Sequence, residues 1–170
     1  MSQESRTETV ESTGLSQAKA IVARIQRLII TAALAAFGYG AFLMAGRAYC
    51  AGGFNSDGDV LDADGNVTES VPQCISLTLG PSGVIYVAIA VITILAIRAV
   101  HRRASTVADA VRYLDRAAAS VVILAVASLV ISYVWFWQIP IMDWDGGGTF
   151  FFPFPFGAVD VDISPMQPMP

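Results

Sequence analysis

Long runs of apolar residues alternate with polar segments along this chain. The longest run covers residues 117–139 and contains no ionisable side chain. As a helix it would be roughly 34 Å long, which is enough to cross a hydrocarbon core of about 30 Å. Residues 28–46 and 81–100 are two further runs, and the only charge in them, Arg98, lies near an end where its side chain can reach the headgroups. The pattern therefore predicts three transmembrane helices.

The segments between these runs complete the predicted layout. In chain order we expect a disordered cytoplasmic tail (1–16), an amphipathic lead-in and first transmembrane helix (17–46), an acidic extracytoplasmic loop (47–80), a second transmembrane helix (81–100), a basic cytoplasmic connection (101–116), a third transmembrane helix (117–139) and an extracytoplasmic Phe/Pro-rich tail (140–170). The expected fold class is an all-α integral membrane protein with a small disulfide-closed outer loop and an irregular outer tail.

Local signals refine two of these segments. Within residues 60–69 the pair Asp64-Gly65 suits a type I′ turn, which predicts a small hairpin in the acidic loop. Thr106 followed by Asp109 resembles a capping box, and Pro140 ends the apolar run. One long helix is therefore expected from about residue 106 to residue 138, with its first third outside the lipid.

The composition favours lipid over water as the surrounding medium. Hydrophobic residues make up 55% of the chain and charged residues only 14%, which is too apolar for an ordinary soluble domain. The formal net charge is −4, and no basic patch interleaved with aromatic residues lies away from the predicted spans. Nucleic acid is therefore excluded as a partner, and the lipid bilayer and a larger membrane protein complex are the expected ones.

The positive charges predict how the chain is oriented. Of ten Lys and Arg residues, nine lie before the first run or around the second connection, and only Arg47 lies elsewhere. Under the positive-inside rule the N-terminus is cytoplasmic and the C-terminus extracytoplasmic, in a multi-pass protein of the cell membrane. Both cysteines, Cys50 and Cys74, then lie outside, where oxidation is permitted. We predict a Cys50–Cys74 disulfide that stabilises the loop by about 3 kcal/mol on the chain-entropy model.

Reactive chemistry is not indicated. Proton relays and ion paths inside membranes usually need Asp, Glu, Lys, Arg or His side chains, and the three span cores contain none of these. The only histidine, His101, lies at the cytoplasmic boundary, so one chain cannot build a bis-His haem or a His-based metal site. We therefore expect no enzyme activity, no catalytic residues, no cofactor and no resident metal.

The acidic loop invites a calcium interpretation through Asp57, Asp59, Asp62 and Asp64. An EF-hand loop with Gly65 at its sixth position would have valines at positions 1 and 12, where oxygen ligands are needed. An EF-hand is thus excluded and solvated turn acids are favoured. An irregular Ca²⁺ site stays open.

Two features suggest contacts with other helices or proteins. Ala32, Ala36 and Gly40 form a stripe of small residues along the first span, which lets a second helix approach closely, although Ala-rich spans also produce such stripes by chance. The tail is rich in Phe and Pro, and exposed Phe side chains are costly in water. It either folds back on the bilayer interface or the outer loop, or docks in a membrane partner. The hypothetical partner-binding residues are Phe150, Phe151, Phe152, Phe154 and Phe156.

These features favour a non-catalytic accessory or assembly subunit of a larger membrane complex, for example respiratory or envelope machinery. Two alternatives stay open. A homo-oligomeric small transporter or channel would need a polar path, for which Thr93, Ser120, Ser128 and Ser132 are the only modest candidates. A membrane sensor would use the acidic loop outside and residues 106–116 inside.

Overall fold

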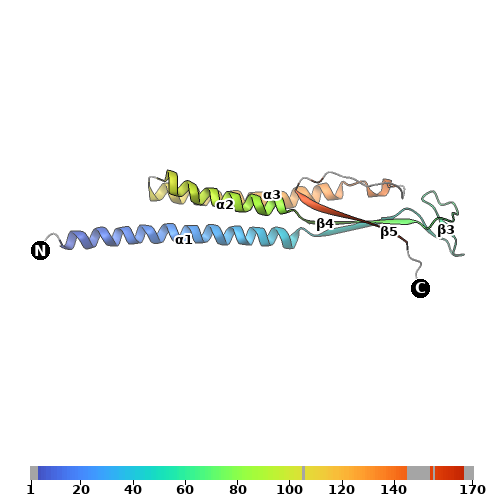
Figure 1. Ribbon diagram of the computed structural model, residues 1–170, viewed down its shortest axis with the longest axis horizontal. Coiled ribbons are helices and arrows are strands. Elements are labelled where there is room, and N and C mark those ends of the chain that lie inside the picture. The colour runs from blue at the N-terminus through green and yellow to red at the C-terminus, as the bar shows by residue number, and fades with distance from the viewer. Residues whose placement is uncertain (1–3, 105, 145–153, 155, 167–170) are drawn as a thin grey trace. The chain divides into compact units, whose positions relative to one another are not determined.

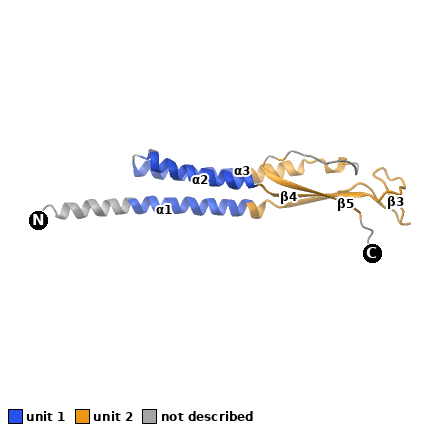
Figure 2. Cartoon of the chain, in the orientation of Figure 1, with its two compact units in different colours: residues 1–39, 83–127 blue, residues 40–82, 128–170 orange. Residues whose placement is uncertain are grey.

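The computed structural model describes residues 4–104, 106–144, 154 and 156–166, and its helices and strands are drawn in Figure 1. The described residues form three long helices, a three-stranded sheet and a two-stranded sheet. The chain divides into two compact units, coloured separately in Figure 2. Unit 1 comprises residues 1–39 and 83–127, and unit 2 comprises residues 40–82 and 128–170.

The helices confirm three segments suited to a membrane. Helix α1 covers Glu4–Phe42, α2 covers Gly83–Arg103 and α3 covers Val107–Trp137. Among the described residues, the stretches long and apolar enough to cross a bilayer are Ala18–Phe42, Gly83–Arg102 and Val107–Asp143. Apolar side chains on these helices are exposed, with Phe37 at 75% and Val84 at 71%, as lipid-facing residues would be. Helix α1 extends back to Glu4, where the sequence predicted a disordered tail.

Unit 1 has a small core where its three helices meet. Leu28 of α1, Ala96 of α2 and Leu114 of α3 form one buried cluster together with Ala117. The two alanines leave room for the larger leucines, as is usual where membrane helices pack closely. Tyr39 and Tyr86 also meet edge to face, with ring centroids 5.5 Å apart.

The start of α3 confirms the predicted cap. The Thr106 hydroxyl accepts the backbone N–H of Asp109 at 3.1 Å, and it donates to the Asp109 carboxylate at 2.8 Å. The side chain therefore satisfies one of the amides that lack a partner in the first turn of a helix.

Unit 2 is built on an antiparallel sheet in the order β1-β4-β5. Strand β1 covers Ala45–Cys50, β4 covers Gln73–Pro81 and β5 covers Gly157–Pro165. Leu77 in the central strand is paired with Arg47 on one side and Val161 on the other. Side chains alternate along β4, since Ile75, Leu77 and Leu79 are buried whereas the residues between them are not.

This sheet corrects the expected fold class. The prediction of an all-α protein with an irregular outer tail is wrong, because residues 73–81 and 157–165 pair as strands. Both segments alternate apolar with polar residues, as half-buried strands do. Neither segment was predicted as a strand, because a short alternating segment forms a stable strand only when it pairs with a partner distant in sequence. Strand β1 also begins at Ala45, so α1 ends at Phe42 rather than continuing to residue 46.

The acidic loop contains the second sheet. Strand β2 covers Gly53–Phe54 and pairs with β3, which covers Val60–Leu61. Leu61 forms a bridge with Val67 across a turn in which Gly65 has a φ of +82°, so a hairpin does turn at the predicted Asp64-Gly65. The connection between β2 and β3 turns at Gly58, whose φ of +89° likewise suits glycine.

Candidate functional site

The disulfide joins the first two strands of the large sheet. Cys50 and Cys74 are directly opposite each other in the β1–β4 register and are bonded, with Cα atoms 4.0 Å apart. The predicted pairing is confirmed, and the chain has no free cysteine. The bond closes the loop that carries β2 and β3, so it attaches that loop to the end of the β1–β4 strand pair.

Arg47 connects strand β1 with the end of α3 inside unit 2. Its Nη1 donates to the carbonyl of Ile139 at 3.1 Å and lies 3.4 Å from the carbonyls of Phe136 and Trp137. Its guanidinium carbon also lies 5.3 Å from the centre of the Trp137 ring. The last carbonyls of a helix lack internal partners and carry partial negative charge, so this arginine caps α3. A short 3-10 helix, η1, follows at Ile141–Asp143.

The Phe-rich segment lies partly outside the described residues. Phe150, Phe151 and Phe152 belong to the part that the structure does not describe. The Phe154 ring lies next to Gly157 and Leu79, because a Cβ added to Gly157 would be 2.6 Å from Phe154 Cε1 and 2.9 Å from Leu79 Cδ1. Phe154 is thus packed on the chain's own sheet, and Phe156 is half-buried. A partner-binding role for these five residues stays a prediction.

The acidic loop contains a repeated turn that the sequence analysis missed. Asn55 Oδ1 accepts the amides of residues two and four positions later, Asp57 and Asp59, at 3.0 and 2.8 Å. Asp62 Oδ1 accepts the amides of Asp64 and Asn66 in the same way, at 3.0 and 2.8 Å. The signal was present in the sequence, since residues 55–60 and 62–67 share the pattern Asx-x-Asp-Gly-Asx-Val. Each copy forms one Asx turn closed by glycine.

The Asp62 carboxylate of this loop accepts hydrogen bonds from the backbone. Hydrogen bonds from backbone amides, the Asn66 N–H first, hold the pKa of the Asp62 carboxyl below its usual value of 3.8. Among the described residues, no group of three or more His, Cys, Asp or Glu side chains lies close enough together to hold a metal ion.

One face of the large sheet is exposed and polar. Ser76 and Thr78 of β4 are paired in register with Asp162 and Asp160 of β5, and all four side chains are exposed. Strand β5 pairs with β4 along one edge, and no other described strand pairs with its second edge. This edge, nine residues long, and the acidic face beside it form an accessible polar surface of unit 2.

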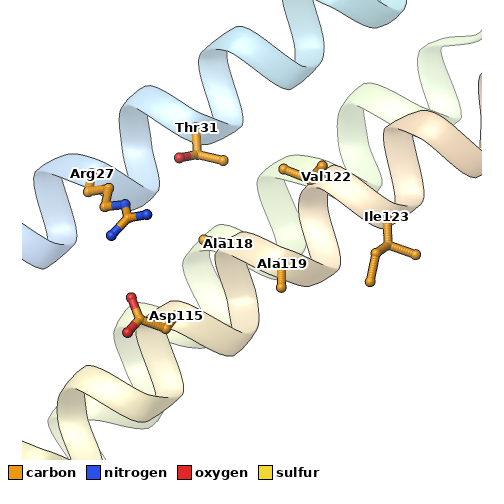
Figure 3. Close-up of a pocket in the computed structure, with 7 residues that line it drawn as sticks. All are labelled: Arg27, Thr31, Asp115, Ala118, Ala119, Val122 and Ile123. Atoms are coloured by element: carbon orange, nitrogen blue, oxygen red, sulfur yellow. The ribbon is translucent and has the colours of Figure 1, made fainter.

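Unit 1 contains a cleft of about 460 Å³ between α1 and α3 (Figure 3). Helix α1 contributes Arg27 and Thr31, whose side chains point toward α3. Helix α3 contributes residues one and two turns apart on one side: Asp115, Ala118, Ala119, Val122 and Ile123. One end of the cleft is therefore charged and the other is apolar. Asp115 is already paired, because its carboxylate lies 2.9 Å from the guanidinium of Arg24.

Two smaller clefts in unit 1 are also lined by arginines. Arg98 and Arg102 line one of about 320 Å³ on α2, and Arg112 and Arg116 line one of about 120 Å³ at the start of α3. The Arg24–Asp115 pair is the one ion pair found among the described residues. The arginine-bearing segments of the three helices thus have positive charge that is not paired among the described residues.

The predicted small-residue stripe is buried at one end. Ala32 is 9% exposed, whereas Ala36 and Gly40 are half-buried. The helix-packing role of these residues stays a prediction. The serines considered for a polar path differ, since Ser128 and Ser132 are buried whereas Ser120 is exposed.

Searches against protein-family models, curated proteins and solved structures found no match to this chain.

Proposed function

We propose that this protein is a non-catalytic accessory subunit, anchored by three membrane helices, that presents its outer sheet to a larger membrane protein complex. The observation that carries the proposal is the second edge of β5, with which no described strand pairs. An edge of nine residues offers main-chain N–H and C=O groups with which an extended segment of another protein can pair.

The charge beside this edge specifies the partner further. Asp160 and Asp162 are exposed on the face next to the unpaired edge, and no ion pair involving either is present among the described residues. Because complementary charges steer association and fix register, the partner segment carries Lys or Arg next to its pairing backbone. The disulfide supports this role, since it holds β1 to the central strand that β5 uses.

The charge distribution supports one orientation. The Lys and Arg residues other than Arg47 lie before the first span or around the α2–α3 connection, which favours a cytoplasmic N-terminus and an extracytoplasmic sheet in the cell membrane. Arg47 has a separate explanation, because it caps α3. A phosphatase reporter fused after Pro170 should be active outside the cytoplasm, and an inactive one would contradict this orientation.

The docking proposal is tested by native-membrane purification and mass spectrometry of the co-purified chains. The double variant Asp160→Lys/Asp162→Lys reverses the charge beside β5 and should lose the larger membrane subunits that the unaltered protein retains. Asp57→Lys/Asp64→Lys makes the same change in net charge in the acidic loop, where these two side chains have no hydrogen-bond partner among the described residues. This control should retain the subunits. Deletion of the tail would be a poorer test because it removes β5 itself.

Other outcomes would contradict the proposal. A purified assembly that contains only copies of this chain would favour the homo-oligomeric transporter or channel. A soluble cytoplasmic protein as the sole companion would favour the sensor. Equal retention of the subunits by both double variants would remove β5 as the docking edge.

A further inference from the structure

The side chains of five arginines of unit 1 have neither a hydrogen bond nor an ion pair among the described residues: Arg27, Arg98, Arg102, Arg112 and Arg116. They belong to the segments 17–27 and 98–116, which together contain eight Lys and Arg against two Asp. One of those acids, Asp115, is neutralised by Arg24. Most of the positive charge on these segments therefore has no partner among the described residues, and it attracts an anion.

The cleft between α1 and α3 divides into a polar and an apolar half. At the polar end Arg27 and Thr31 face α3, and the Thr31 hydroxyl, like the Arg27 guanidinium, has no hydrogen-bond partner among the described residues. Val122 and Ile123 lie farther along α3, and Ile123 is 66% exposed. Ala118 and Ala119 lie between the polar and the apolar residues along α3, and their small side chains leave room in the cleft. An amphiphile with a negative head and an apolar chain matches this order of residues.

We propose that this cleft binds an anionic phospholipid, with its phosphate on Arg27 and Thr31 and its acyl chain along Val122 and Ile123. The guanidinium fork suits phosphate oxygens, and a hydroxyl adds a further donor. Basic pockets between membrane helices are a recognised setting for anionic headgroups. Free inorganic phosphate uses only the polar half, so it binds more weakly than the lipid. The inference needs the helices to lie in a bilayer, but it does not depend on the β5 partner.

The test titrates the full-length protein in detergent with phosphatidylglycerol and with phosphatidylcholine, and counts bound lipids by native mass spectrometry. Phosphatidylglycerol should bind more tightly, and Arg27→Gln should weaken it by about fivefold or more, as expected for the loss of one cation near an anionic headgroup. Lys19→Gln removes the same charge about 12 Å farther along α1, which is beyond a Debye length, and should change the affinity by less than about twofold.

A second pair of variants leaves every charge in place. Ala119→Phe fills the floor of the cleft from an exposed position and should reduce phosphatidylglycerol binding as much as Arg27→Gln does. Ser120→Phe adds a ring to another face of the same helix, outside the cleft, and should leave binding unchanged. Thermal unfolding of each variant checks its fold, and these two substitutions are at exposed positions where a ring is tolerated.

Three results would overturn the proposal. Equal losses for Lys19→Gln and Arg27→Gln would mean that only general surface charge acts. Unchanged binding by Ala119→Phe would place the lipid elsewhere. Full displacement of phosphatidylglycerol by millimolar inorganic phosphate would identify the ligand as free phosphate rather than lipid.

Discussion

The guanidinium of Arg47 in β1 donates to the carbonyl of Ile139 just beyond α3, at 3.1 Å. This bond links the first strand of the sheet to the end of the last helix, and the Trp137 ring lies against the same guanidinium. Arg47 is the one cation on its side of the charge distribution, and its contacts give it a structural role there. A charged donor stabilises the end of a helix through both its hydrogen bonds and the helix dipole.

Replacing Arg47 should therefore destabilise unit 2. We expect Arg47→Gln to lower the free energy of unfolding by about 1.5–3 kcal/mol, the usual range for hydrogen bonds that involve a charged group. Arg47→Lys keeps the charge but loses the planar fork, and should fall between the two proteins. Thermal unfolding in detergent measures the change. Equal stability of Arg47→Gln and the unaltered protein would show that the contacts do not cap α3.

The disulfide gives a second prediction, confined to unit 2. The bonded cysteines are 24 residues apart, so removing the bond by Cys50→Ser/Cys74→Ser should cost about 3 kcal/mol on the chain-entropy model. Limited proteolysis should cut residues 51–72 faster, while the helical circular dichroism signal stays the same. Reducing agent serves as the control, because it should reproduce the effect in the unaltered protein and add nothing to the double variant.

The helices were predictable from sequence because their signal is local. An uncharged run of about 20 residues needs no partner to be recognised, and the Thr106–Asp109 cap lies within four residues. Cys50 and Cys74 were also predictable, because the chain has only two cysteines and both fall on one side of the charge pattern. The pattern of charge and hydrophobicity along the chain was sufficient to predict these features.

The large sheet needed information from distant segments. Leu79 pairs with Val159, 80 positions away, and only that pairing turns two short alternating segments into strands. The cleft was missed for a similar reason. Arg27 was counted among the charges before the first run, but no pattern along the chain brings it and Asp115 to one cleft. The repeated Asx turns, in contrast, were local and could have been found by comparing residues 55–60 with 62–67.

Gly157 gives a third prediction, at the start of β5. A Cβ there would lie 2.6 Å from Phe154 Cε1 and 2.9 Å from Leu79 Cδ1, so Gly157→Ala should destabilise the sheet by about 1–3 kcal/mol through overpacking. Gly53→Ala is the matched control, because no atom lies within 4 Å of the added Cβ and its φ is not positive. Combining Gly157→Ala with Phe154→Ala should cost less than the sum of the single changes, since the two share one contact. Additive costs would show that the Phe154 ring does not lie over Gly157.

The acid dependence of the Asp62 turn gives the last prediction. The amides of Asn66 and Asp64 hold the pKa of Asp62 below its usual value of 3.8, so the folded turn favours the carboxylate. A lowered pKa means that this contribution is complete above about pH 3.8 and is lost as the pH falls through the lower, folded value. Hydrogen exchange of the Asn66 amide should therefore accelerate, beyond its intrinsic pH dependence, as the pH falls from about 5 to about 2.

Asp62→Asn keeps the acceptor oxygen without a titrating group and should abolish the extra acceleration. The Asp57 amide is an internal control, because it is bound by the neutral Asn55 side chain. The same acceleration at Asp57 would mean that the whole loop unfolds in acid, so that Asp62 is not the titrating group.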